Sequence, residues 1–112
     1  DGEVEGSHLT GRVVGERGAR VVGSRIIGQA YIGEGAVVEG AYIGPFTSLG
    51  PGARVVRAEV EYAILEDQAV VEDTPLRLQE SILGVGAQVR GRNGLPRAHR
   101  LVLGDLSQVE LA

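Results

Sequence analysis

The sequence predicts an all-β fold, a parallel β-helix in which short strands wind around a triangular core. Three observations predict it. An aliphatic residue recurs every five or six positions, a small residue precedes most of them by two positions, and equivalent positions repeat about every 17 residues. No window carries an apolar stripe at helical spacing, and the 18 glycines disfavour helices. A chain of 112 residues then forms roughly six coils around three parallel sheets.

The recurring aliphatic residues define the inside of the predicted coils. They are Val4, Leu9, Val21, Ile26, Ile32, Val38, Ile43, Leu49, Val55, Val60, Leu65, Val71, Leu78, Leu83, Val89, Leu103 and Val109. Because alternate residues of a strand share a face, the small residue and the aliphatic residue both point inward, and the residue between them points outward. The remaining residues of each repeat are rich in Gly, Glu, Asp and Pro and form the corners. Gly15 stands at a position of this series where an aliphatic residue is expected, and so adds no side chain to the predicted core.

The outward residues sort into three rows, one for each face of the prism. The first face is polar and carries His8, Arg25, Tyr42, Glu59 and Arg77. The second face carries Val14, Tyr31, Ser48, Ile64, Ile82 and Val102. The third face alternates between polar and apolar residues and carries Arg20, Val37, Arg54, Val70, Gln88 and Gln108.

The second face is the predicted contact surface, because all its members except Ser48 are apolar and a monomer would expose them in a row. The predicted interface residues are Val14, Tyr31, Ile64, Ile82 and Val102. They would be buried against a second subunit or against a part of the protein outside this sequence. The alternative is that strand propensity alone places branched residues there.

Two segments interrupt the repeat. Residues 72–81 contain Pro75 and a longer step between aliphatic residues, which predicts a bulged corner. Residues 90–100 contain no aliphatic residue of the series and are predicted to form an excursion loop, followed by a capping coil at 101–111. Clustered arginines can bind a phosphate or a carboxylate. The anion-binding candidates in this loop are Arg90, Arg92, Arg97 and Arg100. The alternative is a solvated loop that leads into the cap.

Composition excludes several other classes of function. Without cysteine, the chain has no disulfide, no thiolate nucleophile and no thiolate metal site, and we predict no metal site and no cofactor in it. All 11 basic residues are arginine, so no lysine can act as a base. A net charge of -4 argues against a nucleic-acid partner. No apolar segment is long enough for a membrane span and no signal peptide is present, so we expect a soluble, cytoplasmic protein.

Four stretches give the sequence a resemblance to a known family. They are "GEVEG" at 2–6, "VVEGAYIGPFTSLGPGARV" at 37–55, "AEVEYAILED" at 58–67 and "HRLVLGDLSQVEL" at 99–111. With the hexapeptide rhythm, these stretches resemble the carboxy-terminal domain of long-form glucose-1-phosphate thymidylyltransferases. The resemblance spans nearly the whole chain, although Gly15 stands where the family usually has an aliphatic residue. It implies that the β-helix is left-handed, which periodicity alone does not show.

The resemblance also implies a function. The family joins a sugar 1-phosphate to a nucleoside triphosphate and releases pyrophosphate, with Mg²⁺ and the catalytic residues in an amino-terminal nucleotidyltransferase domain. That domain is absent from this sequence, which also lacks a starting methionine, so we interpret residues 1–112 as one domain of a longer protein. No catalytic residue can therefore be assigned here, and the chain is expected to be inactive alone.

Two functions remain open from the sequence. The domain could organise the enzyme as a homo-oligomer, a trimer or a dimer, or dock on its own catalytic domain. Alternatively, it could be a hexapeptide acyltransferase that acts on a sugar nucleotide, with a histidine as the base. Only His8 and His99 could take that role, and His99 in the arginine-rich loop is the better candidate.

Overall fold

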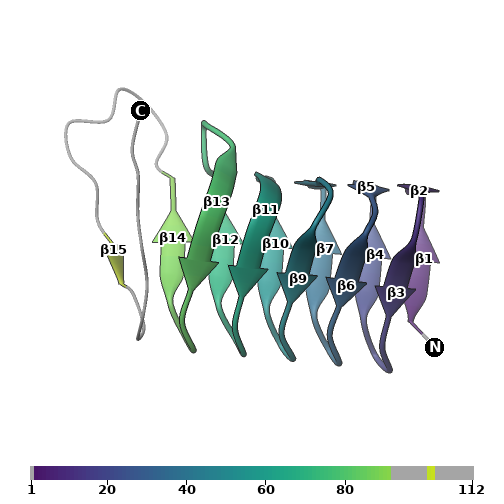
Figure 1. Ribbon diagram of the computed structural model, residues 1–112, viewed down its shortest axis with the longest axis horizontal. Coiled ribbons are helices and arrows are strands. Elements are labelled where there is room, and N and C mark those ends of the chain that lie inside the picture. Colours follow the sequence, from purple (N-terminus) through teal and green to yellow (C-terminus); the bar gives the residue numbers. More distant parts are fainter. Residues whose placement is uncertain (1, 92–100, 103–112) are drawn as a thin grey trace.

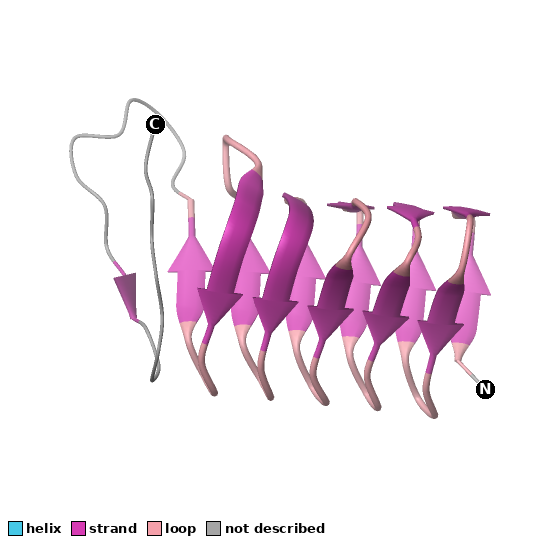
Figure 2. Ribbon diagram, in the orientation of Figure 1, coloured by secondary structure: helices cyan, strands magenta, loops and turns pink. Residues whose placement is uncertain are grey.

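The computed structural model, which describes residues 2–91 and the backbone of residues 101–102, confirms the parallel β-helix (Figure 1). Strands and corners account for the whole described part, which contains no helix (Figure 2). In Figure 1 the chain runs down the near side and up the far side while it advances from right to left. The coils therefore wind in the left-handed sense.

Three faces are formed by equivalent strands of successive coils. The first face contains β2 (His8–Thr10), β5 (Arg25–Ile27), β8 (Tyr42–Ile43) and the start of β11 (Glu59–Leu65). The second contains β3 (Val13–Gly15), β6 (Ala30–Ile32), β9 (Thr47–Leu49) and the end of β11. β13 (Leu78–Leu83) follows β11 from the first face onto the second. The third contains β1 (Glu3–Glu5), β4 (Arg20–Val22), β7 (Val37–Glu39), β10 (Arg54–Val56), β12 (Val70–Glu72) and β14 (Gln88–Arg90).

The register of these strands reproduces the coil length read from the sequence. Val21 pairs with Val38 and Val38 with Val55, so each coil advances by 17 residues there. Five coils are complete, and β14 begins a sixth. The last described strand, β15 (Leu101–Val102), differs from the others because it pairs with β14 in the antiparallel direction.

The core is a stack of the predicted inward residues. Ile26, Ile32, Ile43, Leu49 and Val38 are fully buried, and the alanines at the small positions are buried beside them. Three aliphatic side chains already fill the narrow prism, so only small residues fit at the remaining inward positions. The first coil differs: Val4 is 52 % exposed and Leu9 is 44 % exposed, because the described chain has only one coil in contact with them. Their predicted burial in the core is therefore not observed.

Hydroxyl residues at small positions have a second role at the corners. The backbone N–H of Ser24 donates to Ser7 Oγ at 2.9 Å, and that of Ala41 donates to Ser24 Oγ at 3.0 Å. Ser24 Oγ in turn donates to the carbonyl oxygen of Val22 at 2.8 Å. Each hydroxyl thus satisfies a backbone donor of the next coil while remaining small enough for the interior.

The bulged corner predicted around Pro75 is confirmed. β12 ends at Glu72 and β13 begins at Leu78, so residues 73–77 form a longer corner than those between the earlier coils. Gly91 packs directly under this corner. A Cβ atom at Gly91 would lie 1.8 Å from the carbonyl oxygen of Asp73, so only glycine allows this approach.

Candidate functional site

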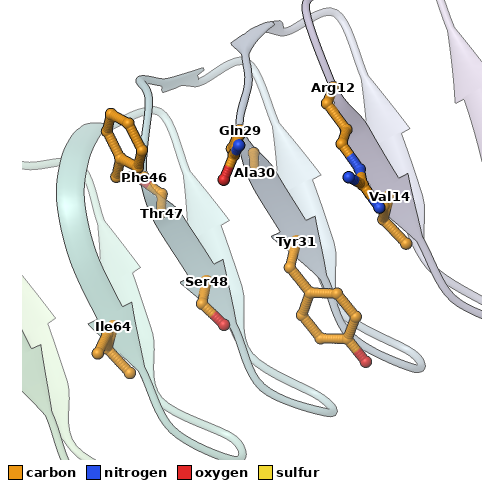
Figure 3. Close-up of a pocket in the computed structure, with 9 residues that line it drawn as sticks. All are labelled: Arg12, Val14, Gln29, Ala30, Tyr31, Phe46, Thr47, Ser48 and Ile64. Atoms are coloured by element: carbon orange, nitrogen blue, oxygen red, sulfur yellow. The ribbon is translucent and has the colours of Figure 1, made fainter.

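The second face presents the apolar row that the sequence predicts. Val14 pairs with Tyr31, Tyr31 with Ser48, Ser48 with Ile64 and Ile64 with Ile82, so the five residues lie side by side on successive coils. Figure 3 shows Val14, Tyr31, Ser48 and Ile64 projecting from the same side of their strands. The four apolar side chains of the row are between 37 % and 46 % exposed. We call these five residues the second-face row.

An aromatic corner borders the second-face row. Phe46 and Tyr62 occupy equivalent corner positions, with ring centroids 5.5 Å apart, and are 60 % and 47 % exposed. Both have positive φ, at 57° and 50°. The left-handed region is costly for bulky side chains, and glycine or asparagine would relieve the strain. The two exposed aromatic side chains extend the apolar surface beside the second-face row.

The corner and the row together form an open groove with a volume of about 400 Å³. Arg12, Gln29 and Phe46 line its upper edge in Figure 3, and Tyr31, Ser48 and Ile64 line its floor. The groove is predominantly apolar. An arrangement of this kind can exclude water from a flat partner but offers few polar atoms to orient a small substrate.

Val102, the sixth residue predicted for the second-face row, is placed differently. Its backbone pairs with Gln88 of β14, on the sheet of the third face. β15 runs antiparallel to β14, so it does not continue the parallel stack. The predicted excursion loop and capping coil stay predictions, because residues 92–100 and 103–111 lie outside the described residues and Arg90 belongs to β14. Its role as an interface residue stays a prediction, since its side chain lies outside the described part.

The first face is polar, as predicted, and its Arg77 is paired with two glutamates. The Arg77 guanidinium lies 3.0 Å from Glu59 Oε1 and 3.2 Å from Glu61 Oε1, and it stacks on the Tyr42 ring at 4.8 Å. The hydrogen bond to Glu59 is the main cause of a raised pKa for Arg77, with Glu61 adding to it. His8 projects from the same face beside Arg25. The compensated charges of this face are therefore gathered around Arg77.

The structure describes only one residue of the predicted anion site. Arg90 Nε donates to Glu72 Oε1 at 2.7 Å, and its Nη1 donates to Gln88 Oε1. The charge of Arg90 is thus already paired across the coils. Arg92, Arg97, Arg100 and the candidate base His99 lie outside the described residues, so the anion site and the acyltransferase base stay predictions.

A second groove, of about 580 Å³, lies on the first face under the 73–77 corner. Tyr42, Arg57, Thr74 and Arg77 line it. Arg57 is held by Asp73 and Arg77 by two glutamates, so the groove offers no unpaired cation. Within residues 2–91, no group of three or more His, Cys, Asp and Glu residues is arranged to hold a metal ion.

Sequence reasoning missed the corner residues that border the second-face row. Register makes Arg12, Gln29, Phe46, Tyr62 and Glu80 equivalent in successive coils. The signal was present, because each stands two positions before an outward residue of the second face. It was overlooked because corners were treated as turn residues without a shared surface.

These features define the described chain as a hexapeptide-repeat β-helix domain with an exposed, largely apolar second face. No protein-family model matches it. Curated proteins do: the chain is 42 % identical over 103 residues to a glucose-1-phosphate thymidylyltransferase of Streptomyces antibioticus, and 42 % identical over 108 residues to one of Streptomyces griseus. A low-salt glycan biosynthesis nucleotidyltransferase of Haloferax volcanii is 34 % identical over 71 residues.

The resemblance to glucose-1-phosphate thymidylyltransferases predicted from the residues is thereby confirmed. The matches cover 92 % and 96 % of this chain but only 29 % and 30 % of the two Streptomyces proteins. The chain thus corresponds to less than a third of these relatives, the extent expected of a carboxy-terminal β-helix domain. Within the described residues, no helix is both long and apolar enough to span a membrane.

Proposed function

We propose that this chain is the β-helical assembly domain of a glucose-1-phosphate thymidylyltransferase-like enzyme of the cytoplasm. A separate nucleotidyltransferase domain of the same protein would join the sugar 1-phosphate to the nucleoside triphosphate and release pyrophosphate, with Mg²⁺ bound there. The domain described here would hold subunits together and carry no catalytic residue.

The exposed second-face row is the observation that carries this proposal. The row spans five coils and four of its five side chains are apolar and exposed, and Phe46 and Tyr62 extend the surface at the corner. The first face, by contrast, is polar, and its Arg77 is paired within the chain. A row of this length, next to polar faces, is the expected signature of a surface that is covered in the assembled protein.

The first test measures the solution mass of the 112-residue chain by light scattering, for the unmodified sequence and for Ile64→Arg and Ile82→Arg. We expect a discrete oligomer for the unmodified chain. Each arginine would place an uncompensated charge in the contact and shift the protein to monomers, with unchanged circular dichroism because both side chains point away from the core.

Leu76→Arg is the matched control. Leu76 is an exposed aliphatic residue of the 73–77 corner, which lies away from the second face. The Leu76→Arg substitution should leave the solution mass unchanged. An oligomer that survived both Ile64→Arg and Ile82→Arg would overturn the assignment of the interface. If the unmodified chain were monomeric, the second-face row would instead be assigned as the contact with the catalytic domain of the full-length protein.

A further inference from the structure

We propose that the second face binds the second face of another copy of this chain in an antiparallel orientation, about a twofold axis that lies in the interface over β9. Each Arg12 then faces Glu80 of the partner chain. This inference rests on the proposed function, which makes the face a self-association surface, and adds its partner, direction and register.

The two charged residues stand at opposite ends of one corner. Arg12 lies in the first coil and Glu80 in the fifth, with Gln29, Phe46 and Tyr62 between them. Four coil steps of about 4.8 Å place them roughly 19 Å apart, too far to attract each other within one chain. Both are exposed, and neither belongs to an ion pair among residues 2–91.

This twofold axis lies between the two facing copies of β9 and runs parallel to them. Rotation about it reverses the order of the coils in the second copy. In an isologous contact, the same patch is used twice. Arg12 then meets the partner's Glu80, so that two opposite-charge pairs close the ends of the contact. Complementary charges of this kind fix the register of an interface more than they add to its affinity.

The apolar residues fit the same symmetry. Reversal places Val14 against the partner's Ile82, and Tyr31 against the partner's Ile64. Ser48, the only small residue of the second-face row, falls on the axis together with Phe46 of the corner. The small serine leaves room at the centre for the two Phe46 rings, which are more exposed than the apolar side chains of the row.

The parallel arrangement, with the twofold axis along the prism, matches the charges less well. It would place the Arg12 corner of one chain against the opposite corner of the other, where Arg17, Glu34 and Val85 stand. Arg12 would meet the partner's Arg17, and Glu80 would meet the partner's Val85. The antiparallel contact has its own unfavourable pair, Glu34 with the partner's Asp67, which lies at the far corner. The contact therefore closes along the Arg12 corner and stays open to solvent at the other.

Chemical cross-linking tests the direction, because the sequence contains no cysteine. Val14→Cys and Ile82→Cys chains are prepared, one of them isotopically labelled. Each variant alone, and a mixture of the two, is treated with a short bismaleimide linker of about 10 Å, the spacing of packed sheets. We expect mixed Val14–Ile82 dimers by mass spectrometry and little cross-linking of either chain with itself. Self-linking of each variant at the rate of the mixture would overturn the antiparallel contact while leaving the second face as the interface.

Charge reversal tests the register. Arg12→Glu and Glu80→Arg should each weaken association about fivefold to tenfold, since the symmetry doubles the effect of one exposed pair. The double variant restores both pairs and should recover the unmodified affinity to within about twofold. Arg17→Glu is the control and should change little. Additive weakening in the double variant, or stronger association of Arg17→Glu, would overturn the proposed register.

Discussion

At the residue scale, Arg57 and Asp73 form the clearest charge pair of the described chain. Arg57 Nε and Nη2 donate to the two oxygens of Asp73 across neighbouring coils. This hydrogen bonding is the largest cause of a lowered pKa for Asp73 and of a raised pKa for Arg57. Both side chains are largely exposed, so solvent and salt screen the pair.

The lowered pKa of Asp73 predicts how stability depends on pH. Because the folded state favours the ionised carboxyl, the contribution of the pair is present above the unfolded-state pKa of roughly 4 and is lost as the pH falls through the lower folded-state value. We expect Asp73→Asn to reduce the thermal midpoint slightly at neutral pH, and the difference from the unmodified chain to vanish in acid. The raised pKa of Arg57 gives no such pH dependence, because arginine keeps its proton throughout the accessible pH range.

Thermal melts from neutral pH to about pH 2 check this expectation. Glu34→Gln is the control, since Glu34 is exposed and belongs to no ion pair among residues 2–91. A difference between Asp73→Asn and the unmodified chain that persisted at the acid end would contradict the assigned cause.

At the scale of the element, the third face supplies a matched series of side chains. Its inward residues Val4, Val21, Val38, Val55 and Val71 lie in one row, paired coil by coil. Val4 is 52 % exposed and Val38 is fully buried. The residue type and strand position are constant, and the number of covering coils changes.

We predict that Val38→Ala costs about 1.5–3 kcal/mol of unfolding free energy, because two buried methyl groups and their contacts are lost. Val4→Ala should cost less than about 1 kcal/mol, since half of its surface is already in water. Urea unfolding of both variants with a common m-value measures the two costs. Equal costs would mean that the first coil is covered in solution.

At the scale of the whole molecule, each coil contacts only its neighbours. Stability is then shared along the stack, and the coils at the ends open before those in the middle. We predict that amides of β7, β9 and β10 exchange with deuterium more slowly than those of β1, β2 and β3. Native-state hydrogen exchange followed by NMR gives the order. Uniform protection over the first four coils would show that they open as a single unit.

Most of this architecture could be predicted from residue spacing. The strand parity of the triplets Ala30–Tyr31–Ile32 and Ala63–Ile64–Leu65 fixed which side chains point inward, and the coil length fixed which outward residues share a row. The second-face row was predicted for the same reason. The predictions differed where spacing carries no information: at Val4 and Leu9, whose exposure depends on what covers a coil, and at Val102, whose strand runs antiparallel to β14.

The corner contribution to the site could not be predicted from parity. A corner residue stands where the chain turns from one face to the next, which for Tyr62 is within the long strand β11, so its direction depends on backbone conformation and not on strand parity. Phe46 and Tyr62 adopt the left-handed conformation that sequence rules reserve mainly for glycine and asparagine. The stacking of the two rings follows from register between coils and becomes visible only in three dimensions.

The constant length of the coil also bears on how such a domain can change in evolution. Loss of a single residue within a strand would turn every later inward side chain of that strand outward, because strand parity is two. Removal of residues 33–49 takes out 17 residues and rejoins Ile32 to Gly50, so the downstream pattern keeps its phase. Whole coils can therefore be gained or lost more readily than single residues, and each such event would lengthen or shorten the second-face row by one side chain.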